Sequence, residues 1–258
     1  MKSFRTDLHV HTVLSPCGDL EMSPGNIVLT AIRHGLDIIA ITDHNSTKQC
    51  ETVWKLGQKL GLTVIPGCEI TSREEVHSLA LFADFDALAV FQEFLDQHLT
   101  IISNNTKIFG YQLVVDENEN IHEEIDWYLG ASLDVSIEEV ERKVHELCGI
   151  FILAHIDRPR NSIFSQLGFI PPELKVDALQ ISKLADEKGI REKYSIKPEI
   201  TLVKFSDAHY PGDLGKTFTL FEMENPTFNE LRKALMGEDG RRVHIPEASP
   251  KPPPKEGA

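Results

Sequence analysis

Two histidines near the start of the chain lie on one face of an expected strand. His9 and His11 alternate with the apolar residues Leu8 and Val10, the period-two pattern of a strand with one buried face. Residues i and i+2 of a strand point the same way, so the two imidazoles are expected side by side. Such a pair suits zinc, manganese or iron. An isolated H-x-H is more often a strand with partly exposed histidines. The residues downstream therefore decide between this interpretation and a metal site.

Further metal-ligating residue types recur downstream, next to the ends of short apolar runs. The runs that read as strands buried on both faces are 37–42, 63–68, 149–154 and 201–205. Functional groups of parallel barrels collect at the carboxyl ends of the strands. The residues at such ends are His9, His11, His44, Glu69, His155, Asp207 and His209. A further strand, about 77–82, begins with His77 instead of ending with a histidine.

Helical patterns alternate with these strands, at about 24–34, 46–60, 87–103, 136–148 and 226–236. Pro24 stands where the first turn of a helix tolerates proline, and Ser136 with Glu139 forms a capping box. Short buried strands that alternate with helices predict a parallel α/β sheet. Seven or eight such units in 258 residues favour a closed or distorted barrel over an open sheet.

Two segments depart from this rhythm. Residues 104–132 read as an inserted hairpin and helix, either a lid over the site or an extra core layer. Residues 246–258 are rich in proline, lysine and glutamate and are predicted to form a disordered tail. The expected organisation is therefore one barrel domain over residues 1–245, followed by the tail.

The amino-acid composition limits which binding partners and which cellular compartment are expected. No stretch approaches the roughly 18 apolar residues of a membrane span, and no signal peptide is recognisable, so no membrane partner is expected. Four scattered cysteines without a C-x-x-C pair predict a reducing cytoplasm. The net charge of −14 argues against duplex nucleic acid, whereas bound cations would still admit a phosphorylated substrate. The oligomeric state is not predicted.

The order of the motifs resembles that of a known family. The motifs are His9-x-His11, Thr42-Asp43-His44, Pro66-Gly67-Cys68-Glu69, His77, Ala154-His155 and Asp207-Ala208-His209. In this order they resemble the PHP family, the polymerase and histidinol phosphatase superfamily of metal-dependent phosphoesterases. The resemblance runs from about residue 5 to 209 and is strongest to stand-alone bacterial members. It implies a distorted (β/α)7 TIM-like barrel with an inserted segment.

The resemblance also implies a trinuclear centre of divalent metals, Mn2+, Zn2+ or Fe2+. His9, His11, Glu69 and Asp207 would hold the first metal. Glu69 would bridge to a second metal, completed by His77 and His155. His44 and His209 would hold the third, together with a residue of the loop after the first strand.

That loop departs from the commoner family pattern. Many relatives have Ser-Asp-Gly or a histidine there, whereas this chain has Pro16 and Cys17. Asp19, Cys17 and Glu21 are the candidate ligands, and Asp19 is preferred. A cysteine would bias the site toward zinc, while nitrogen and oxygen ligands suit manganese or iron equally well.

The implied chemistry is attack of a metal-activated water on phosphorus, with Glu69, Asp207 and Arg158 as the catalytic residues. A shared carboxylate reduces the repulsion between neighbouring cations. Arg158 stands three residues after His155, where relatives often have a phosphate-binding arginine, and a guanidinium binds two phosphate oxygens at once. Arg160 is a second candidate for substrate binding, and Lys183 a weaker one.

The leading prediction is a metal-dependent phosphoesterase that hydrolyses a small phosphomonoester, a nucleotide or a short RNA or DNA oligonucleotide. One alternative is an amidohydrolase-like zinc hydrolase, although those enzymes typically use a lysine bridge. The other is a regulatory module that binds metal or a phosphorylated ligand without turnover. Asp7 and Asp43, which precede the histidines, either orient imidazoles or close turns. Histidines 34, 98, 122 and 145 are expected at the surface.

Overall fold

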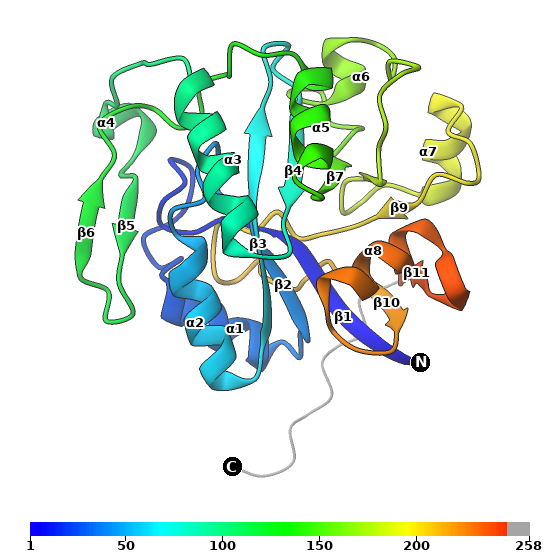
Figure 1. Ribbon diagram of the computed structural model, residues 1–258, viewed down its shortest axis with the longest axis horizontal. Helices are drawn as coiled ribbons and strands as arrows, with labels where there is room; N and C mark the ends of the chain where they lie inside the picture. Colours follow the sequence, from blue (N-terminus) through cyan, green and yellow to red (C-terminus); the bar gives the residue numbers. More distant parts are fainter. Residues whose placement is uncertain (247–258) are drawn as a thin grey trace.

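Nine strands form one strongly curved sheet in the computed structural model, which describes residues 1–246 (Figure 1). Their order in the sheet is β11-β10-β1-β2-β3-β4-β7-β8-β9. The strands are β1 (Lys2–Val10), β2 (Ile38–Ile41), β3 (Thr63–Thr71), β4 (His77–Leu81), β7 (Ile150–Leu153), β8 (Ala178–Gln180), β9 (Leu202–Val203), β10 (Thr219–Met223) and β11 (Arg242–His244). A separate hairpin pairs β5 (Leu113–Val115) with β6 (Ile121–Glu124).

Helices cover the outside of the curved sheet (Figure 1). They are α1 (Pro24–Arg33), α2 (Cys50–Leu60), α3 (Phe85–His98), α4 (Thr106–Phe109), α5 (Ile137–Glu146), α6 (Ile163–Gln166), α7 (Glu187–Tyr194), α8 (Phe228–Met236) and the 3-10 turn η1 (Glu238–Gly240). The capping box is present, because the Ser136 side chain accepts from Glu139 N and Ser136 N donates to the Glu139 carboxylate. Within residues 1–246, none of the helices combines the length and apolar character that a membrane crossing requires.

Seven of the nine strands close on themselves. After β9, Ala208 pairs with Val10 of β1 in a parallel bridge, in which His11 N donates to Ala208 O at 3.0 Å. The closed set is therefore β1, β2, β3, β4, β7, β8 and β9. β10 pairs antiparallel with the first half of β1, and β11 pairs antiparallel with β10. The predicted distorted (β/α)7 TIM-like barrel is confirmed.

One barrel strand runs against the expected parallel direction. β4 is antiparallel to both neighbours, β3 and β7, because residues 72–76 between β3 and β4 are too few for a parallel crossover connection. The first residue of β4, His77, consequently pairs with Thr71 at the last residue of β3. A histidine at the start of a strand thus reaches the same barrel mouth as residues at the ends of the other strands.

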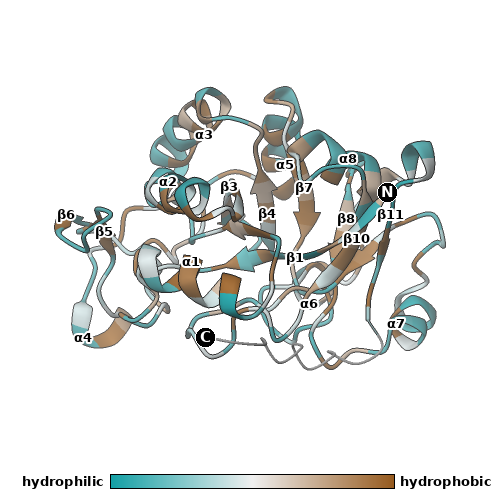
Figure 2. Cartoon of the chain, turned by 90° about the horizontal axis from the view of Figure 1, so that it is seen from below, coloured by the Kyte–Doolittle hydropathy of each residue, from teal (hydrophilic) through white to brown (hydrophobic). Residues whose placement is uncertain are grey.

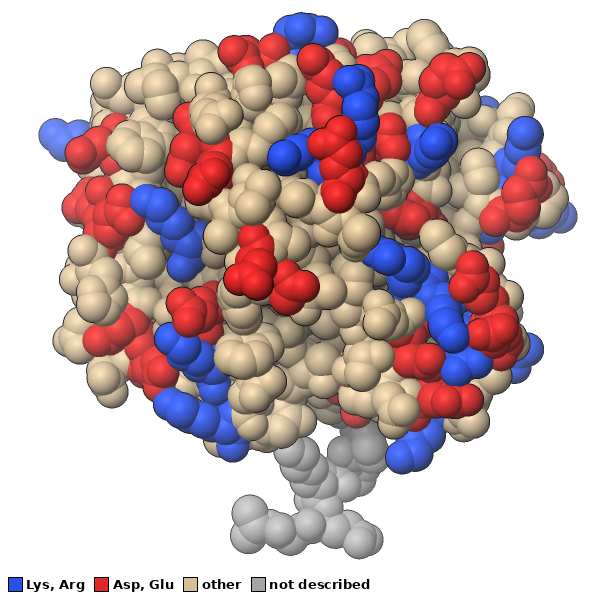
Figure 3. All heavy atoms as spheres, viewed as in Figure 1, with Lys and Arg blue, Asp and Glu red and all other residues tan. Residues whose placement is uncertain are grey.

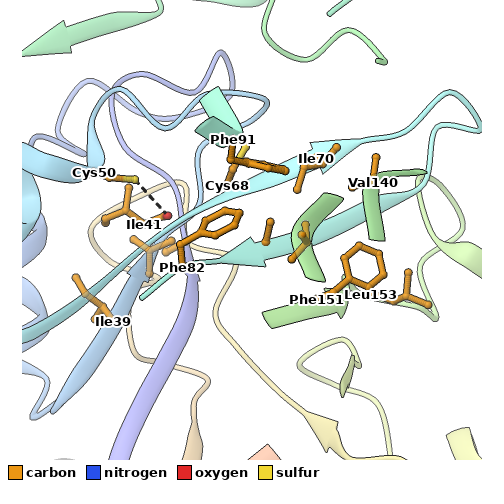
Figure 4. Close-up of a cluster of buried hydrophobic side chains, with 14 of the residues drawn as sticks. Ile39, Ile41, Cys50, Cys68, Ile70, Phe82, Phe91, Val140, Phe151 and Leu153 are labelled. Atoms are coloured by element: carbon orange, nitrogen blue, oxygen red, sulfur yellow. Dashed lines mark hydrogen bonds between the residues drawn. The ribbon is translucent and has the colours of Figure 1, made fainter. Parts of the chain in front are cut away.

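Apolar side chains fill both sides of the strands, as the uninterrupted apolar runs predict. All four residues of β2 are buried, and in Figure 2 the strands β7 and β10 are brown where helices such as α3 show a hydrophilic face. Between the sheet and α3 the rings of Phe82 and Phe91 lie 4.8 Å apart, centroid to centroid, beside Ile70 and Phe151 (Figure 4). This close packing fixes α3 against the strands that carry ligands at the barrel mouth.

The inserted segment 104–132 packs partly as a core layer and partly as a hairpin. Ile125 and Leu129 are buried in the main core, whereas β6 is exposed along its length. Leu113 N donates to Val13 O at 3.2 Å, so the hairpin rests on the loop after β1. Closure as a lid stays a prediction, and the tail predicted at 246–258 falls, from residue 247 on, outside the described residues.

Candidate metal centre

Eight predicted ligands come together at one mouth of the barrel. They are His9, His11, His44, Glu69, His77, His155, Asp207 and His209, from β1, β3, β4 and the segments that follow β2, β7 and β9. His155 and Asp207 have positive φ angles of 27° and 51°. Such backbone strain in non-glycine residues clusters at functional sites, because the surrounding structure must compensate for it.

The first set of ligand atoms has the spacing of a tetrahedral metal site. The Nε2 atoms of His9 and His11 lie 3.1 Å apart. Each lies 3.2 Å from Glu69 Oε2 and 3.2 Å from Asp207 Oδ1. A cation with four ligands at about 2.0 Å has ligand atoms about 3.3 Å from one another. These four residues therefore fit a zinc-sized divalent cation.

Neighbouring polar residues point both Nε2 atoms inward. His9 Nδ1 donates to Gln180 Oε1 at 2.9 Å, and Ser15 Oγ donates to Asp43 Oδ1 at 2.7 Å. The Ser15 hydroxyl is thus left to accept from His11 Nδ1, 2.9 Å away. Both imidazoles thus point Nε2 into the site, the orientation in which a metal-bound histidine donates its other ring N–H to a neighbouring oxygen.

Of these orienting residues the sequence predicted only Asp43. Gln180 was missed, although a polar side chain that ends the buried run of β8 is a usable signal. Asp7, the other candidate, accepts from Ser206 N and Gly215 N and so links β1 to the segments that follow β9.

Four acceptor atoms that converge in a buried pocket require positive charge. Burial alone would lower the pKa of His11, but hydrogen bonds to Asp207 and Glu69 raise it to about 10. Burial alone would raise the pKa of Glu69, yet His9, His77 and His44 hold it well below the usual range. The carboxylates thus stay ionised, and a bound cation would replace the protons on the imidazoles.

A second set gathers around the other oxygen of Glu69. Oε1 lies 2.9 Å from His77 Nδ1 and 3.2 Å from His155 Nε2, whereas Oε2 faces His9 and His11. Nδ1 of His155 is buried and has no hydrogen-bond partner among the described residues. One carboxylate with each oxygen on a different histidine set is the arrangement that bridges two cations.

The loop after β1 brings a thiol, and not the preferred carboxylate, to the third set. Donor atoms of His11, Cys17, His44 and His209 all lie within 4.8 Å of one another. Desolvation, and then the Glu69 and Asp207 carboxylates, raise the pKa of the Cys17 thiol. The Asp19 carboxylate instead accepts from Glu21 N at 2.8 Å, so the structure does not bring Asp19 or Glu21 into this set.

The predicted arginines lie at the rim of the centre. Arg158 Nη2 is 2.6 Å from Asp207 Oδ2, and 45% of the Arg158 side chain is exposed. Two cavities, of about 220 Å³ and about 230 Å³, share His155 and Arg158 and otherwise have separate walls. Arg160 lines the first cavity and Lys183 the second.

Comparison of the sequence with known proteins gives one family. The profile of the PHP domain matches residues 7–189. The uncharacterized protein MJ1587 of Methanocaldococcus jannaschii is 35% identical over 89 residues, which are 31% of this chain and 52% of that protein. The chain thus covers about half the length of this curated relative.

Solved structures agree on the fold. The lesion-specific endonuclease PfuEndoQ from Pyrococcus furiosus superposes with a TM-score of 0.74 at 22% identity, over 94% of this chain and 58% of that one. A putative metal-dependent phosphoesterase from Bifidobacterium adolescentis superposes with a TM-score of 0.54 at 19% identity, over 88% and 94% of the two chains. At these identities the likeness establishes the barrel alone.

The exclusion of duplex nucleic acid is wrong. Endonuclease Q, of the same fold (TM-score 0.67, 23% identity, over 93% of this chain and 58% of that one), is crystallised with a 27-mer duplex that has an abasic lesion at the active site. Net charge describes the whole surface, whereas the binding of nucleic acid depends on the electrostatic potential at the barrel mouth. Local arginines, and cations if bound there, would make that potential more positive. On the face in Figure 3 basic and acidic side chains are in fact interspersed.

Proposed function

Because the chain belongs to the PHP domain family, we propose that it is a metal-dependent hydrolase of phosphodiester bonds in nucleotides or nucleic-acid strands. The family placement confirms the enzyme class predicted from the sequence, a hydrolase of phosphoric esters. The observation that supports the metal centre most strongly is the near-tetrahedral set of His9, His11, Glu69 and Asp207. The preference for a diester over a monoester rests on the two cavities.

The ligand roles follow from which atoms face one another. His9, His11 and Asp207 would hold one cation, and His77 and His155 a second, with Glu69 between them. Bound divalent cations would acidify a water molecule and stabilise charge on the phosphoryl oxygens. Gln180 and Ser15 keep the imidazoles of the first set in the productive orientation.

Arg158 is placed to bind the phosphoryl group. Its guanidinium already contacts an anionic oxygen, Asp207 Oδ2, and its exposed fraction leaves further N–H groups free for a substrate. A guanidinium fork binds two phosphate oxygens at once and so fixes their orientation. Asp207 would orient this fork while its other oxygen faces His9 and His11.

Two cavities around one arginine suit a phosphate with two substituents. His155 and Arg158 border both cavities, while Asn161 lines only the first and Phe205 only the second. A phosphomonoester has one organic group and would leave one cavity empty. A phosphodiester places a group on each side of the phosphorus. Endonuclease Q, whose fold this chain shares, acts on such bonds in damaged DNA.

The test is a substrate panel with the full chain. It compares bis-(p-nitrophenyl) phosphate with p-nitrophenyl phosphate, and single-stranded with duplex oligonucleotides, each with and without an abasic site. Diesters are expected to be hydrolysed faster than the monoester. A chelator should abolish turnover, and Mn2+ or Zn2+ should restore it.

The alternatives give different outcomes in the same panel. Faster hydrolysis of the monoester would refute the diester preference, and turnover that ignores the chelator would refute the metal mechanism. Stoichiometric metal binding without hydrolysis of any phosphoester would favour the regulatory module. Hydrolysis of cyclic amides instead would favour an amidohydrolase-like enzyme, although here Glu69 rather than a lysine lies between the two histidine sets.

A further inference from the structure

The third set of ligands differs chemically from the other two. The donor groups of His11, Cys17, His44 and His209 lie within 4.8 Å of one another. The His11 ring also belongs to the first set. Cys17 and His209 belong to this set alone, and His44, which also lies close to Glu69 and His77, is the third donor that they can share for a separate cation. The first two sets contain only nitrogen and oxygen donors, whereas this one contains a sulfur.

The backbone holds Cys17 in this position. Gly18 N donates to Ser15 O at 2.9 Å, so Cys17 is the third residue of a tight turn. A Cβ atom at position 18 would overlap the Thr12 carbonyl oxygen, so only glycine fits. Asp19 N donates to His209 O at 2.9 Å. The turn is thus tied directly to the segment that contributes another member of the cluster.

A buried imidazole at this cluster lacks a partner. His44 is 8% exposed, and its Nδ1 makes no hydrogen bond within residues 1–246, although it lies 3.3 Å from Glu69 Oε2. A buried unpaired nitrogen is costly unless a ligand completes it. The His44 ring lies within 4.8 Å of the other donor groups of the cluster and is therefore placed to coordinate a cation together with them.

We propose that the thiolate of Cys17, together with His44 and His209, binds a cation and that this third position selects zinc. The inference rests on the metal centre of the proposed function and deepens it. The thiol would lose its proton to solvent when the metal binds. Soft sulfur favours Zn2+ over Mn2+, and cysteine with histidine is a common zinc donor set. The centre would then combine one zinc-selective position with two that also accept manganese or iron.

Cobalt titration of the metal-stripped full chain tests this without an activity assay. A thiolate bound to Co2+ gives a sulfur-to-cobalt charge-transfer absorption in the near ultraviolet, which nitrogen and oxygen ligands do not give. The wild-type chain is expected to bind three equivalents and to show the band. Cys17→Ser should lose the band and one equivalent. Cys17→Asp should bind three equivalents without the band.

Two variants serve as matched controls. Cys148→Ser removes the other exposed thiol, and Asp19→Asn removes the competing loop carboxylate. Both should behave as the wild-type chain. The remaining thiols are buried, and each donates to a backbone carbonyl, Cys50 to Gly67 O and Cys68 to Asp43 O.

The outcomes separate this inference from the proposed function. Cobalt binding without the band, a band that persists in Cys17→Ser, or loss of an equivalent only in Asp19→Asn would overturn the role of Cys17 and leave the other two metals in place. No cobalt binding at all would overturn the metal centre itself. Far-ultraviolet circular dichroism checks the fold of each variant, and Cys17→Asp keeps the test decisive if Cys17→Ser unfolds.

Zinc selectivity has its own measurement. The wild-type chain, loaded with zinc and dialysed against excess manganese, should retain one zinc equivalent. Cys17→Asp should exchange all of its zinc, since the softness of the third position is lost. Complete exchange from the wild-type chain would overturn the selectivity.

Discussion

The two oxygens of Glu69 divide the histidines of the centre into two groups. Oε2 faces His9 and His11, and Oε1 faces His77 and His155. Replacing Glu69 by glutamine substitutes an amide nitrogen for one oxygen and removes the negative charge. Such a residue can no longer hold two cations close together.

Glu69→Gln is therefore expected to lose metal and turnover together. Bound cations contribute several kcal/mol to such reactions, so kcat should fall about 100-fold or more. Metal analysis and diesterase assays of the same preparation provide the measurement. Full metal content with unchanged kcat would contradict the bridging role.

Substitution of Arg158 probes the phosphate contact. Arg158→Lys keeps the charge but loses the two-pronged geometry. A charge-assisted hydrogen bond is worth about 1.5–3 kcal/mol, so kcat/KM should fall about 10–100-fold. Arg160→Ala, at a residue that lines the first cavity but not the second, should cost less. Equal losses in the two variants, or loss of metal in Arg158→Lys, would argue against direct phosphate binding.

At the residue scale the sequence predicted most of the candidate site. Eight ligands follow from residue types at strand ends together with the order of the motifs. The ligand from the loop after β1 could not be predicted in this way, since Cys17, Asp19 and Glu21 all lie in that loop and all are possible metal ligands. Only the turn that ends at Gly18 decides which side chain points inward.

Among the elements, β4 is a strand whose direction in the sheet the sequence pattern does not predict. Its apolar run predicts a strand but carries no direction. The short connection at 72–76 is what reverses it and brings His77 to the mouth. Helix α7 was not predicted either, because its composition is polar and only Ile190 is buried. Closure of the barrel was predictable from the number of strands, whereas the Val10–Ala208 contact that closes it was not.

The tight turn after β1 gives a prediction about stability. Gly18→Ala would force the turn away from the Thr12 carbonyl, at a cost of about 1–3 kcal/mol. Gly212→Ala is the matched control, because no atom lies within 4 Å of the added Cβ, and its effect should stay within about 0.5 kcal/mol. Urea unfolding of both variants measures the difference. Equal stabilities would show that the turn is free to move.

A second stability prediction concerns α5, which a histidine links to β8. His145 lies between Asp177 Oδ2, 3.1 Å from Nε2, and Glu141 Oε1, 2.5 Å from Nδ1. The hydrogen bond to Asp177 is the main reason that the pKa of His145 is raised. A raised pKa in the folded state adds stability that is fully present below the ordinary value of about 6.5. That stability is lost as pH rises through the raised pKa.

The free energy of unfolding should therefore fall more steeply in the wild-type chain than in His145→Gln as pH rises above about 6.5. His122→Gln, at an exposed side chain of the hairpin, is the control and should keep the wild-type slope. Parallel curves for the wild-type chain and His145→Gln would contradict the predicted link.

At the scale of the whole molecule, the candidate metal centre connects segments that are far apart in the sequence. The ligands come from segments spread between residues 9 and 209, so bound cations cross-link most strands of the barrel. A ligand at 100 times its dissociation constant stabilises the folded state by about 2.7 kcal/mol. Metal removal should therefore lower Tm, and Mn2+ or Zn2+ should restore it. An unchanged Tm after verified metal loss would show that bound cations do not contribute to the thermal stability of the barrel.

The Val10–Ala208 bridge also has a consequence for the order of events during synthesis. The first strand leaves the ribosome early, while the segment that completes its pairing and supplies Asp207 and His209 emerges much later. During that interval the imidazoles of β1 and the carboxylate of β3 have no complete coordination shell. Loading with metal would thus be a late step of maturation, and a nascent chain that stops short of the bridge would have an incomplete binding site.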